Sequence, residues 1–258
     1  MPYAHPGSLE GKTVIVTGAG RGVGRGIARA LARNGARLVV TDILADELED
    51  ARGELTALGA EVRSVSADLR DITAADLIVD TAVEAFGGLH GLVNNAIAIK
   101  PASPFSSQTA EDFELSSSTG PRATFLLMKA AHPHLVAAGG GSVVNLGSGA
   151  GAGGEPGFAT YGAAKESIRG LSRVAALEWG ADNIRVNVIL PFANSEGALS
   201  WEDSAPDVFK SVMEAVPLKR IGDTENDVGA LVSFLLGDDS TYLTAQSIYV
   251  AGGAGVFR

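Results

Sequence analysis

Lys12-Thr-Val-Ile-Val-Thr17, followed at once by Gly18-Ala-Gly-Arg-Gly-Val-Gly24, is the stretch that decides the fold. Its apolar, β-branched half predicts a short buried strand, and the apolar spacing beyond Gly24 predicts a helix that reaches Asn34. Glycines at 18, 22 and 24 let the backbone turn tightly and approach a pyrophosphate, whose charge the helix N-terminus favours. Strand, glycine turn and helix together predict a dinucleotide-binding site.

An acidic residue stands where a ribose would lie. The predicted strand Arg37-Leu-Val-Val-Thr41 ends at Asp42, eighteen residues beyond Gly24. A carboxylate there can accept hydrogen bonds from both ribose hydroxyls and would repel a 2′-phosphate. The sequence therefore favours NAD over NADP, although Arg21 in the glycine turn weakens that preference.

Tyr161 and Lys165 are the candidate acid/base pair. Four residues apart, they share one face of a helix. A positive charge at ~4 Å, in an effective dielectric of ~20, would lower the pKa of a phenol from ~10 by about 3 units. This spacing alone also fits an ordinary solvated helix face, so the pair gains meaning only from the other motifs.

Taken in order, these motifs resemble the short-chain dehydrogenase/reductase family over nearly the whole chain. The glycine turn looks like the family's cofactor turn, Asp68-Leu69 resembles its adenine-contacting acid, and Asn94-Asn95-Ala96 looks like its conserved strand end. Ser148 lies thirteen residues before Tyr161, as the family's catalytic serine does. The resemblance implies cofactor contacts at Gly18, Arg21, Gly22, Val23, Gly24, Asp42, Asp68, Leu69, Asn95, Tyr161, Lys165 and Pro191.

The resemblance also implies a reaction. Ser148 would hydrogen-bond the substrate oxygen, Tyr161 would exchange the proton, and Lys165 would hold the nicotinamide ribose and lower the pKa of the tyrosine. The expected activity is NAD(H)-dependent hydride transfer between nicotinamide and a secondary alcohol or ketone. A homotetramer is implied, with a dimer as the other possibility. The helices near 111–137 and 158–180 and the segment 249–258 would pack between subunits.

Gly120-Pro121 stands where the family usually has an asparagine at a helix bend, whose main-chain carbonyl takes part in a proton relay to the lysine. Glycine keeps the carbonyl, and Pro121 can bend the helix because its missing N–H leaves the carbonyl of Ser117 without an intrahelical partner. Our hypothesis is that Gly120-Pro121 replaces the asparagine. The competing interpretation is impaired proton release.

Two further departures add bulk near the expected nicotinamide. Ile97 and Phe192 each replace a glycine that is usual in the family. Either residue would press on the ring or narrow the substrate pocket, or else belong to the ordinary core.

A lid over about 193–217 is predicted to select the substrate. Aromatic and apolar residues would make an apolar or cyclic alcohol or ketone the expected substrate, unless they only anchor the lid. The candidates are Trp201, Phe209, Met213, Phe158, Ile99 and Phe105.

Composition suits one α/β domain over residues 1–258. The chain has 46% hydrophobic residues, and strand and helix signals alternate. The pattern predicts a doubly wound, mostly parallel, Rossmann-like sheet. Its strands are expected at 12–18, 37–42, 61–66, 90–95, 141–147, 184–190 and 246–250.

Charge and residue counts exclude several other classes. A net charge of −10 without a basic stripe disfavours nucleic acid and anionic membranes. The absence of cysteine excludes thiolate chemistry, and Pro133, between His132 and His134, is expected to end a helix rather than to complete a metal site. Without an apolar run of ~18 residues or a secretory signal, a cytoplasmic protein is expected.

Two other functions remain open. A nucleotide-bound regulatory module with little redox turnover would explain the changes at Gly120, Ile97 and Phe192. A sugar epimerase or dehydratase is disfavoured, because such relatives usually carry a longer C-terminal substrate region.

Overall fold

A seven-stranded, wholly parallel sheet forms the centre of the protein. The computed structural model describes residues 8–194 and 206–254. The strands lie in the order β3-β2-β1-β4-β5-β6-β7. Their bounds are β1 Thr13–Thr17, β2 Arg37–Asp42, β3 Val62–Ser66, β4 Gly91–Asn94, β5 Gly141–Leu146, β6 Ile184–Pro191 and β7 Ser247–Val250. Each predicted strand end lies within one residue of the observed one, so the doubly wound, Rossmann-like fold is confirmed.

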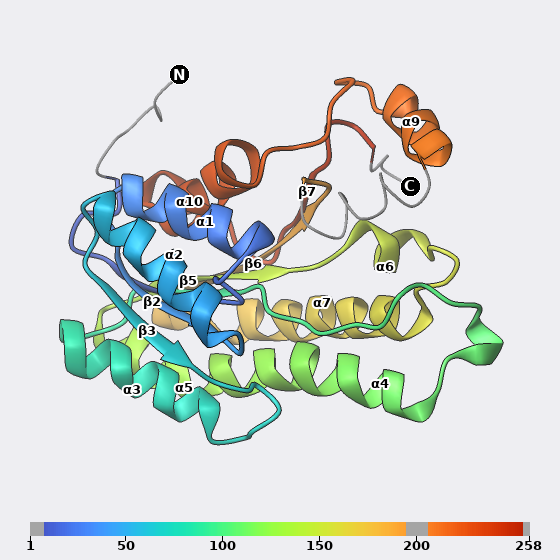
Figure 1. Cartoon of the computed structure of the whole chain (residues 1–258). Helices are drawn as coiled ribbons and strands as arrows, with labels where there is room; N and C mark the ends of the chain where they lie inside the picture. The colour runs from blue at the N-terminus through green and yellow to red at the C-terminus, as the bar shows by residue number, and fades with distance from the viewer. Residues whose placement is uncertain (1–7, 195–205, 255–258) are drawn as a thin grey trace.

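Helices cover both faces of this sheet. In Figure 1, α1, α2 and α10 lie on one side, and α3, α4, α5 and α7 lie on the other. The helices are α1 Gly22–Arg33, α2 Ala45–Ala57, α3 Ala74–Phe86, α4 Ala110–Ser117, α5 Ala123–Ala137, α6 Gly149–Gly153, α7 Ala159–Trp179, α9 Pro206–Ala215 and α10 Ala230–Leu236. Shorter turns are η1 Phe105–Ser107, η2 Ser118–Arg122, η3 Gly180–Asp182, η4 Thr224–Gly229 and η5 Asp238–Ser240.

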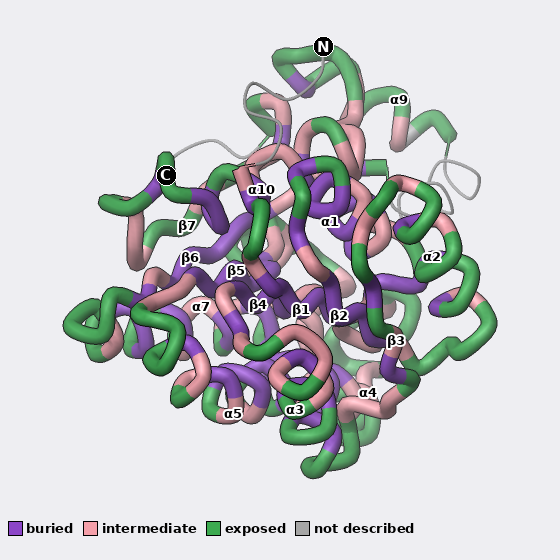
Figure 2. Tube along the Cα trace, turned by 90° about the vertical axis from the view of Figure 1, so that its left-hand side faces the viewer, coloured by how far each residue is buried: buried purple, intermediate pink, exposed green. Residues whose placement is uncertain are grey.

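Alternation along β1 explains why the sheet is buried on both sides. Val14 and Val16 pack in one core cluster with Ile27 and Leu31 of α1, whereas Ile15 points into a second cluster beneath α3, α5 and α7. Figure 2 shows the purple, buried strands sandwiched between these helical layers. A strand buried on both faces reads as a continuous apolar run, which is why the sequence showed it clearly.

The sheet also fixes where a ligand can bind. The chain runs outward from β1 to β3 and then returns to place β4 on the other side of β1. At this reversal of strand order, the loops after the carboxyl ends of β1 and β4 diverge and leave a crevice. The glycine turn follows β1 and Asn95 follows β4, so both predicted motifs lie at this crevice.

The predicted long helix over 111–137 is observed in three parts. Thr109 begins it with a capping box: its hydroxyl accepts the Asp112 N–H, and the Asp112 carboxylate accepts the Thr109 N–H. Between α4 and α5 lies the π-helical turn η2, which contains Gly120 and Pro121. A π-turn moves hydrogen bonds to i+5, so it accommodates a proline that has no N–H to give at i+4.

The prediction that Pro133 ends a helix is wrong, since α5 continues to Ala137. The missing N–H affects only the carbonyl of exposed Lys129, which water can reach, and fully buried Leu135 holds the last turn against the core. His132 contacts Asp182 instead, with 3.2 Å between Nε2 and the carboxylate oxygen. Within residues 8–194 and 206–254, no group of three or more potential ligand residues could hold a metal ion.

The predicted lid is only partly described. Helix α9 occupies its second half and contains Phe209 and Met213, while Trp201 lies outside the described residues. None of the described helices is long and apolar enough to cross a lipid bilayer.

Candidate active site

The glycine turn has the geometry that its sequence predicted. Gly18 and Gly22 have φ values of 64° and 53°, in the left-handed region that side chains disfavour. A Cβ added to Gly24 would lie only 2.0 Å from the carbonyl oxygen of Gly18, so the turn closes on itself without room for a side chain. By contrast, nothing lies within 4 Å of a Cβ built at Gly22, which leaves its backbone open to a ligand.

A clamp from β4 holds this turn in place. The side-chain amide of Asn95 donates to the carbonyls of Thr17 and Gly18, at 2.9 and 3.1 Å. In return, the Thr17 hydroxyl accepts the N–H groups of Asn95 and Ala96, at 3.0 and 3.1 Å. The sequence suggested Asn95 but missed the role of Thr17, because a threonine at a strand end has no distinctive pattern.

Asp42 presents a carboxylate at the end of β2, next to the glycine turn. One oxygen accepts the Gly20 N–H at 3.0 Å, and the other accepts the Leu44 N–H at 3.2 Å. Arg21 in the turn lies 3.7 Å from the carboxylate of Glu47, on the first turn of α2. Asp42, the acid expected at the ribose position, is therefore held in a defined orientation. The charge of Arg21 is partly balanced by the carboxylate of Glu47.

Asp68 and Leu69 follow β3, on the same edge of the sheet. The Asp68 carboxylate pairs with the Arg70 side chain and also accepts the Arg70 N–H, at 2.9 Å. These hydrogen bonds hold the pKa of Asp68 below its usual range. Asp68 is thus a fixed anion at the side of the crevice where the family resemblance places the adenine.

Ser148 and Tyr161 meet beyond the carboxyl end of β5. Ser148 begins the short helix α6, which the sequence did not predict, and its hydroxyl accepts the Ala150 N–H at 3.2 Å. Burial raises the pKa of Tyr161, and a hydrogen bond with Ser148 opposes this increase. The Phe158 ring lies edge-on to the Tyr161 ring, with 6.0 Å between centroids.

Lys165 lies one turn beyond Tyr161 and is only 3% exposed. Its Nζ donates to the carbonyl oxygen of Leu146, at 2.7 Å, and lies 5.7 Å from the centre of the Tyr161 ring. Burial lowers the pKa of Lys165 from 10.5 to about 7, because a low-dielectric surrounding disfavours the charged amine.

The expected effect of Lys165 on Tyr161 is wrong for the protein by itself, because the pKa of the phenol is raised rather than lowered. The sequence argument assumed a full positive charge close to the phenol. Burial disfavours that charge on Lys165, and it disfavours the phenolate on Tyr161 as well. A lowered pKa with cofactor bound stays a prediction.

Two departures from the family pattern lie face to face. A Cβ built at Gly120 would be 2.9 Å from the Cδ1 atom of Ile97 and 3.7 Å from the Cβ of Ala164, next to Lys165. The end of the Ile97 side chain is therefore directed at the π-turn, and Ile97 is half-buried, so the alternatives left open by the sequence stay open. For Phe192, whose N–H donates to the Val250 carbonyl at 2.9 Å beside Pro191, the alternatives stay open.

A buried polar chain that the sequence did not indicate supports the carboxyl edge from below. Asn94 donates to Asn145 at 2.8 Å, and Asn145 donates to Ser172 of α7 at 2.8 Å. These three side chains tie β4 and β5 to the helix that carries Tyr161. Asn94 belongs to the strand-end motif, but nothing in the sequence pairs it with Asn145 or Ser172.

Phe105 and Phe158, both expected at the substrate pocket, line a common groove of about 400 Å³ along α6 and the outer side of α7. Its other lining residues come from 150–166 and do not include Tyr161. Phe158 is the link between this groove and the phenol, because its ring also lies edge-on to the Tyr161 ring.

The residues present fit a nicotinamide dinucleotide, because an open glycine turn at a helix N-terminus lies beside a fixed ribose-position carboxylate, Asp42. Fold and site together define a dinucleotide-dependent oxidoreductase. A family model described as "Enoyl-(Acyl carrier protein) reductase" matches residues 18–255. The chain belongs to the short-chain dehydrogenase/reductase family.

Individual relatives cover almost the full chain. The chain is 40% identical to the 12α-hydroxysteroid dehydrogenase of a Clostridium species, over 96% of this chain and 98% of the relative. Among solved structures, levodione reductase has a TM-score of 0.91 at 31% identity, covering 96% of this chain and 100% of that one. NAD⁺-bound xylitol dehydrogenase has a TM-score of 0.89 at 31% identity, covering 95% and 99%.

Proposed function

We propose that this protein is an NAD(H)-dependent dehydrogenase or carbonyl reductase that acts on a secondary alcohol or ketone. The observation that carries the proposal is the meeting of Ser148, Tyr161 and Lys165 at the carboxyl edge of the sheet, beside the glycine turn. Bound nicotinamide supplies a hydride acceptor or donor at its C4 position.

Each of the three side chains has a separate task. The Tyr161 hydroxyl exchanges a proton with the substrate oxygen. Its hydrogen bond with Ser148 brings the two hydroxyl groups together, so both can reach the same substrate oxygen. Ser148 donates a hydrogen bond to the same oxygen and stabilises the charge that develops there. Lys165 would hold the nicotinamide ribose and, when charged, favours the phenolate of Tyr161.

Asp42 supports NAD as the preferred cofactor. Two backbone N–H groups fix its carboxylate in place. The carboxylate would therefore repel the 2′-phosphate of NADP. Arg21 could relieve that repulsion, but its guanidinium lies 3.7 Å from Glu47, which offsets its charge. Replacing Asp42 with asparagine should reduce the ratio of NADH to NADPH affinity at least tenfold, whereas Asp46→Asn, on exposed α2 surface, should leave it unchanged.

An apolar or cyclic substrate is the second part of the proposal. Phe158 flanks the reactive phenol and offers an apolar wall. The similar proteins named for hydroxysteroid and levodione act, by their names, on ring compounds. The lid residues Phe209 and Met213 are partly buried on α9 and would add to that wall.

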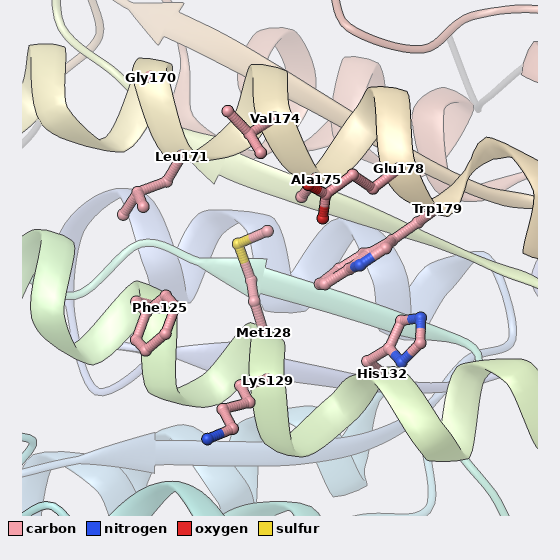
Figure 3. A pocket seen from close by; sticks show the side chains of 10 residues that line it. All are labelled: Phe125, Met128, Lys129, His132, Gly170, Leu171, Val174, Ala175, Glu178 and Trp179. Carbon is pink, nitrogen blue, oxygen red and sulfur yellow. The ribbon is translucent and has the colours of Figure 1, made fainter.

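A homo-oligomer is the third part, and a second copy of this chain is its proposed partner. Figure 3 shows side chains from α5 and α7 lining a groove, which has a volume of about 390 Å³. Phe125 and Val174 are about half exposed there, and Leu177 nearby is 76% exposed. Such contiguous apolar exposure is typical of interfaces. Sedimentation of Val174→Glu beside the unchanged protein should show dissociation; an unchanged mass would count against this interface.

A cytoplasmic location belongs to the same proposal.

One experiment separates this function from a nucleotide-bound module. NADH binding is measured by fluorescence titration, and turnover is measured on a panel of cyclic and open-chain secondary alcohols. We expect tight binding with turnover, and Tyr161→Phe should abolish turnover while leaving binding within about threefold. Tight binding with no turnover on the whole panel would favour the module. One reason to consider the module was the bulk that Ile97 would add near the nicotinamide. That reason is weaker because the end of the Ile97 side chain is directed at Gly120.

A further inference from the structure

The helix that carries Tyr161 begins without a cap of its own. Helix α7 starts at Ala159, and its N-cap residue, Phe158, makes no side-chain hydrogen bond to the helix. The first N–H groups of an α-helix have no intrahelical partner, so another group must accept them. Because Tyr161 lies in this first turn, whatever holds the turn also determines where the phenol lies.

That partner is Gln108, which is 52 residues away in sequence. Its side-chain oxygen accepts the N–H of Thr160, the residue before Tyr161, at 3.0 Å. Its amide nitrogen donates to the carbonyls of Ser103 and Gly157, both at 2.9 Å. One amide therefore ties the loop before α4 to the loop before α7 and caps α7 as well.

The orientation of this amide is fixed by its surroundings. Turned by 180°, the Gln108 side chain would place its NH₂ against the Thr160 N–H and its oxygen against the carbonyls of Ser103 and Gly157. All three hydrogen bonds would be lost together. The amide therefore has a single satisfied orientation.

The backbone of Gln108 is also held firmly. The turn η1 precedes it, and the capping box of Thr109 and Asp112 follows it directly. That box begins α4, which packs against α7. The position of α4 is thus transmitted through one side chain to the start of α7, where the Phe158 ring meets the Tyr161 ring.

We propose that Gln108 is a positioning residue for Tyr161: by capping α7 and joining its preceding loop to the loop before α4, it sets the phenol at the distance that proton exchange requires. This inference rests on the proposed function and deepens it. A displacement near 1 Å at a reacting group lowers rates by about a hundredfold. Gln108 acts through Thr160 and Gly157 and does not touch the glycine turn, so its loss should reduce turnover and leave cofactor affinity intact.

Three variants test this. Gln108→Ala removes all three hydrogen bonds. Gln108→Glu keeps the acceptor for Thr160 but places a carboxylate oxygen against two carbonyls, and protonation at low pH restores one donor. Gln246→Ala is the matched control, because Gln246 is exposed and its side chain donates only to the nearby Thr244 carbonyl, at 2.8 Å.

We expect kcat to fall about ten- to a hundredfold in Gln108→Ala, with the dissociation constant of NADH within twofold of the unchanged protein. In Gln108→Glu, kcat relative to the unchanged protein should recover as the pH is lowered. Gln246→Ala should match the unchanged protein throughout. Unchanged kcat in Gln108→Ala, or a parallel loss of NADH affinity and thermal stability, would overturn the positioning role.

A second readout does not depend on activity. Amide hydrogen exchange of residues 157–162, measured without substrate, should accelerate at least tenfold in Gln108→Ala and stay unchanged in Gln246→Ala. Faster exchange supports the capping role even if no tested alcohol is oxidised, in which case the proposed function fails and Gln108 does not. Unchanged exchange refutes the capping role whatever the turnover.

Discussion

Replacing buried Lys165 with methionine should stabilise the protein when no cofactor is added. Lys165 is 3% exposed, its ammonium donates one hydrogen bond to the Leu146 carbonyl, and burial lowers its pKa from 10.5 to about 7. Since one pKa unit corresponds to about 1.4 kcal/mol, keeping this amine charged in the folded protein costs about 5 kcal/mol. Losing the hydrogen bond to Leu146 offsets about 1 kcal/mol of the gain.

The sign of the pH dependence follows from the lowered pKa. Below pH 7 both folded and unfolded chains carry the proton on Lys165, so the full penalty applies and the methionine variant gains most. Between about 7 and 10.5 the unfolded chain binds the proton and the folded chain does not, so the unchanged protein becomes steadily more stable. The advantage of Lys165→Met should therefore shrink by about 3 kcal/mol between pH 6.5 and pH 9.

Urea unfolding at these two pH values, at one fixed protein concentration, measures the effect. The matched control is Lys210→Met, which removes an exposed lysine and should change stability little at either pH. A gain from Lys165→Met that is the same at pH 6.5 and pH 9, or no gain at pH 6.5, would refute the assignment of a buried, desolvated amine at this position.

Two further predictions concern the glycines. Gly24→Ala should weaken NADH binding by a hundredfold or more, because its Cβ would lie 2.0 Å from the Gly18 carbonyl oxygen. Gly53→Ala, with open space around its Cβ, should leave NADH affinity unchanged and leave the stability of the protein unchanged or slightly higher. Fluorescence titration checks both, and equal affinities would contradict the tight turn. Ile97→Gly should lower Tm by roughly 5 °C or more, whereas Gly120→Asn alone should cost less, because the Ile97 Cδ1 atom that it meets is the end of a flexible side chain. The double variant should recover at least half of the loss, because the two positions share one space. Additive losses in calorimetry would show that they are independent, and a tenfold gain in turnover for Gly120→Asn would contradict the hypothesis that Gly120-Pro121 replaces the family asparagine.

Much of the site could be predicted because its motifs are local. The strand from Thr13 and the glycines that follow it specify a turn through their own φ preferences and the missing Cβ atoms. Asp42 was found because a strand end has a fixed distance in sequence from the turn before it. Even an interruption of the α-helix at Pro121 could be expected, since a proline removes one named hydrogen bond, although its π-helical form could not.

The contacts that join distant segments could not be predicted. Ile97 and Gly120 each look like a separate departure from a family pattern, and only their packing against each other explains both. Gln108 carries no motif at all. The prediction that Pro133 ends a helix failed because the burial of Leu135, two residues further on, outweighs one lost hydrogen bond.

The amino-acid sequence by itself determined the alternation of strands and helices, the glycine turn and the order of Asp42, Ser148, Tyr161 and Lys165, because hydrophobic period and residue spacing act along the chain. Only the tertiary structure decided how those groups behave. Burial sets the pKa values of Tyr161 and Lys165 in directions that spacing alone did not give. The start of α7 is held by a side chain 52 residues away, since desolvation and long-range hydrogen bonds exist only once the chain has folded.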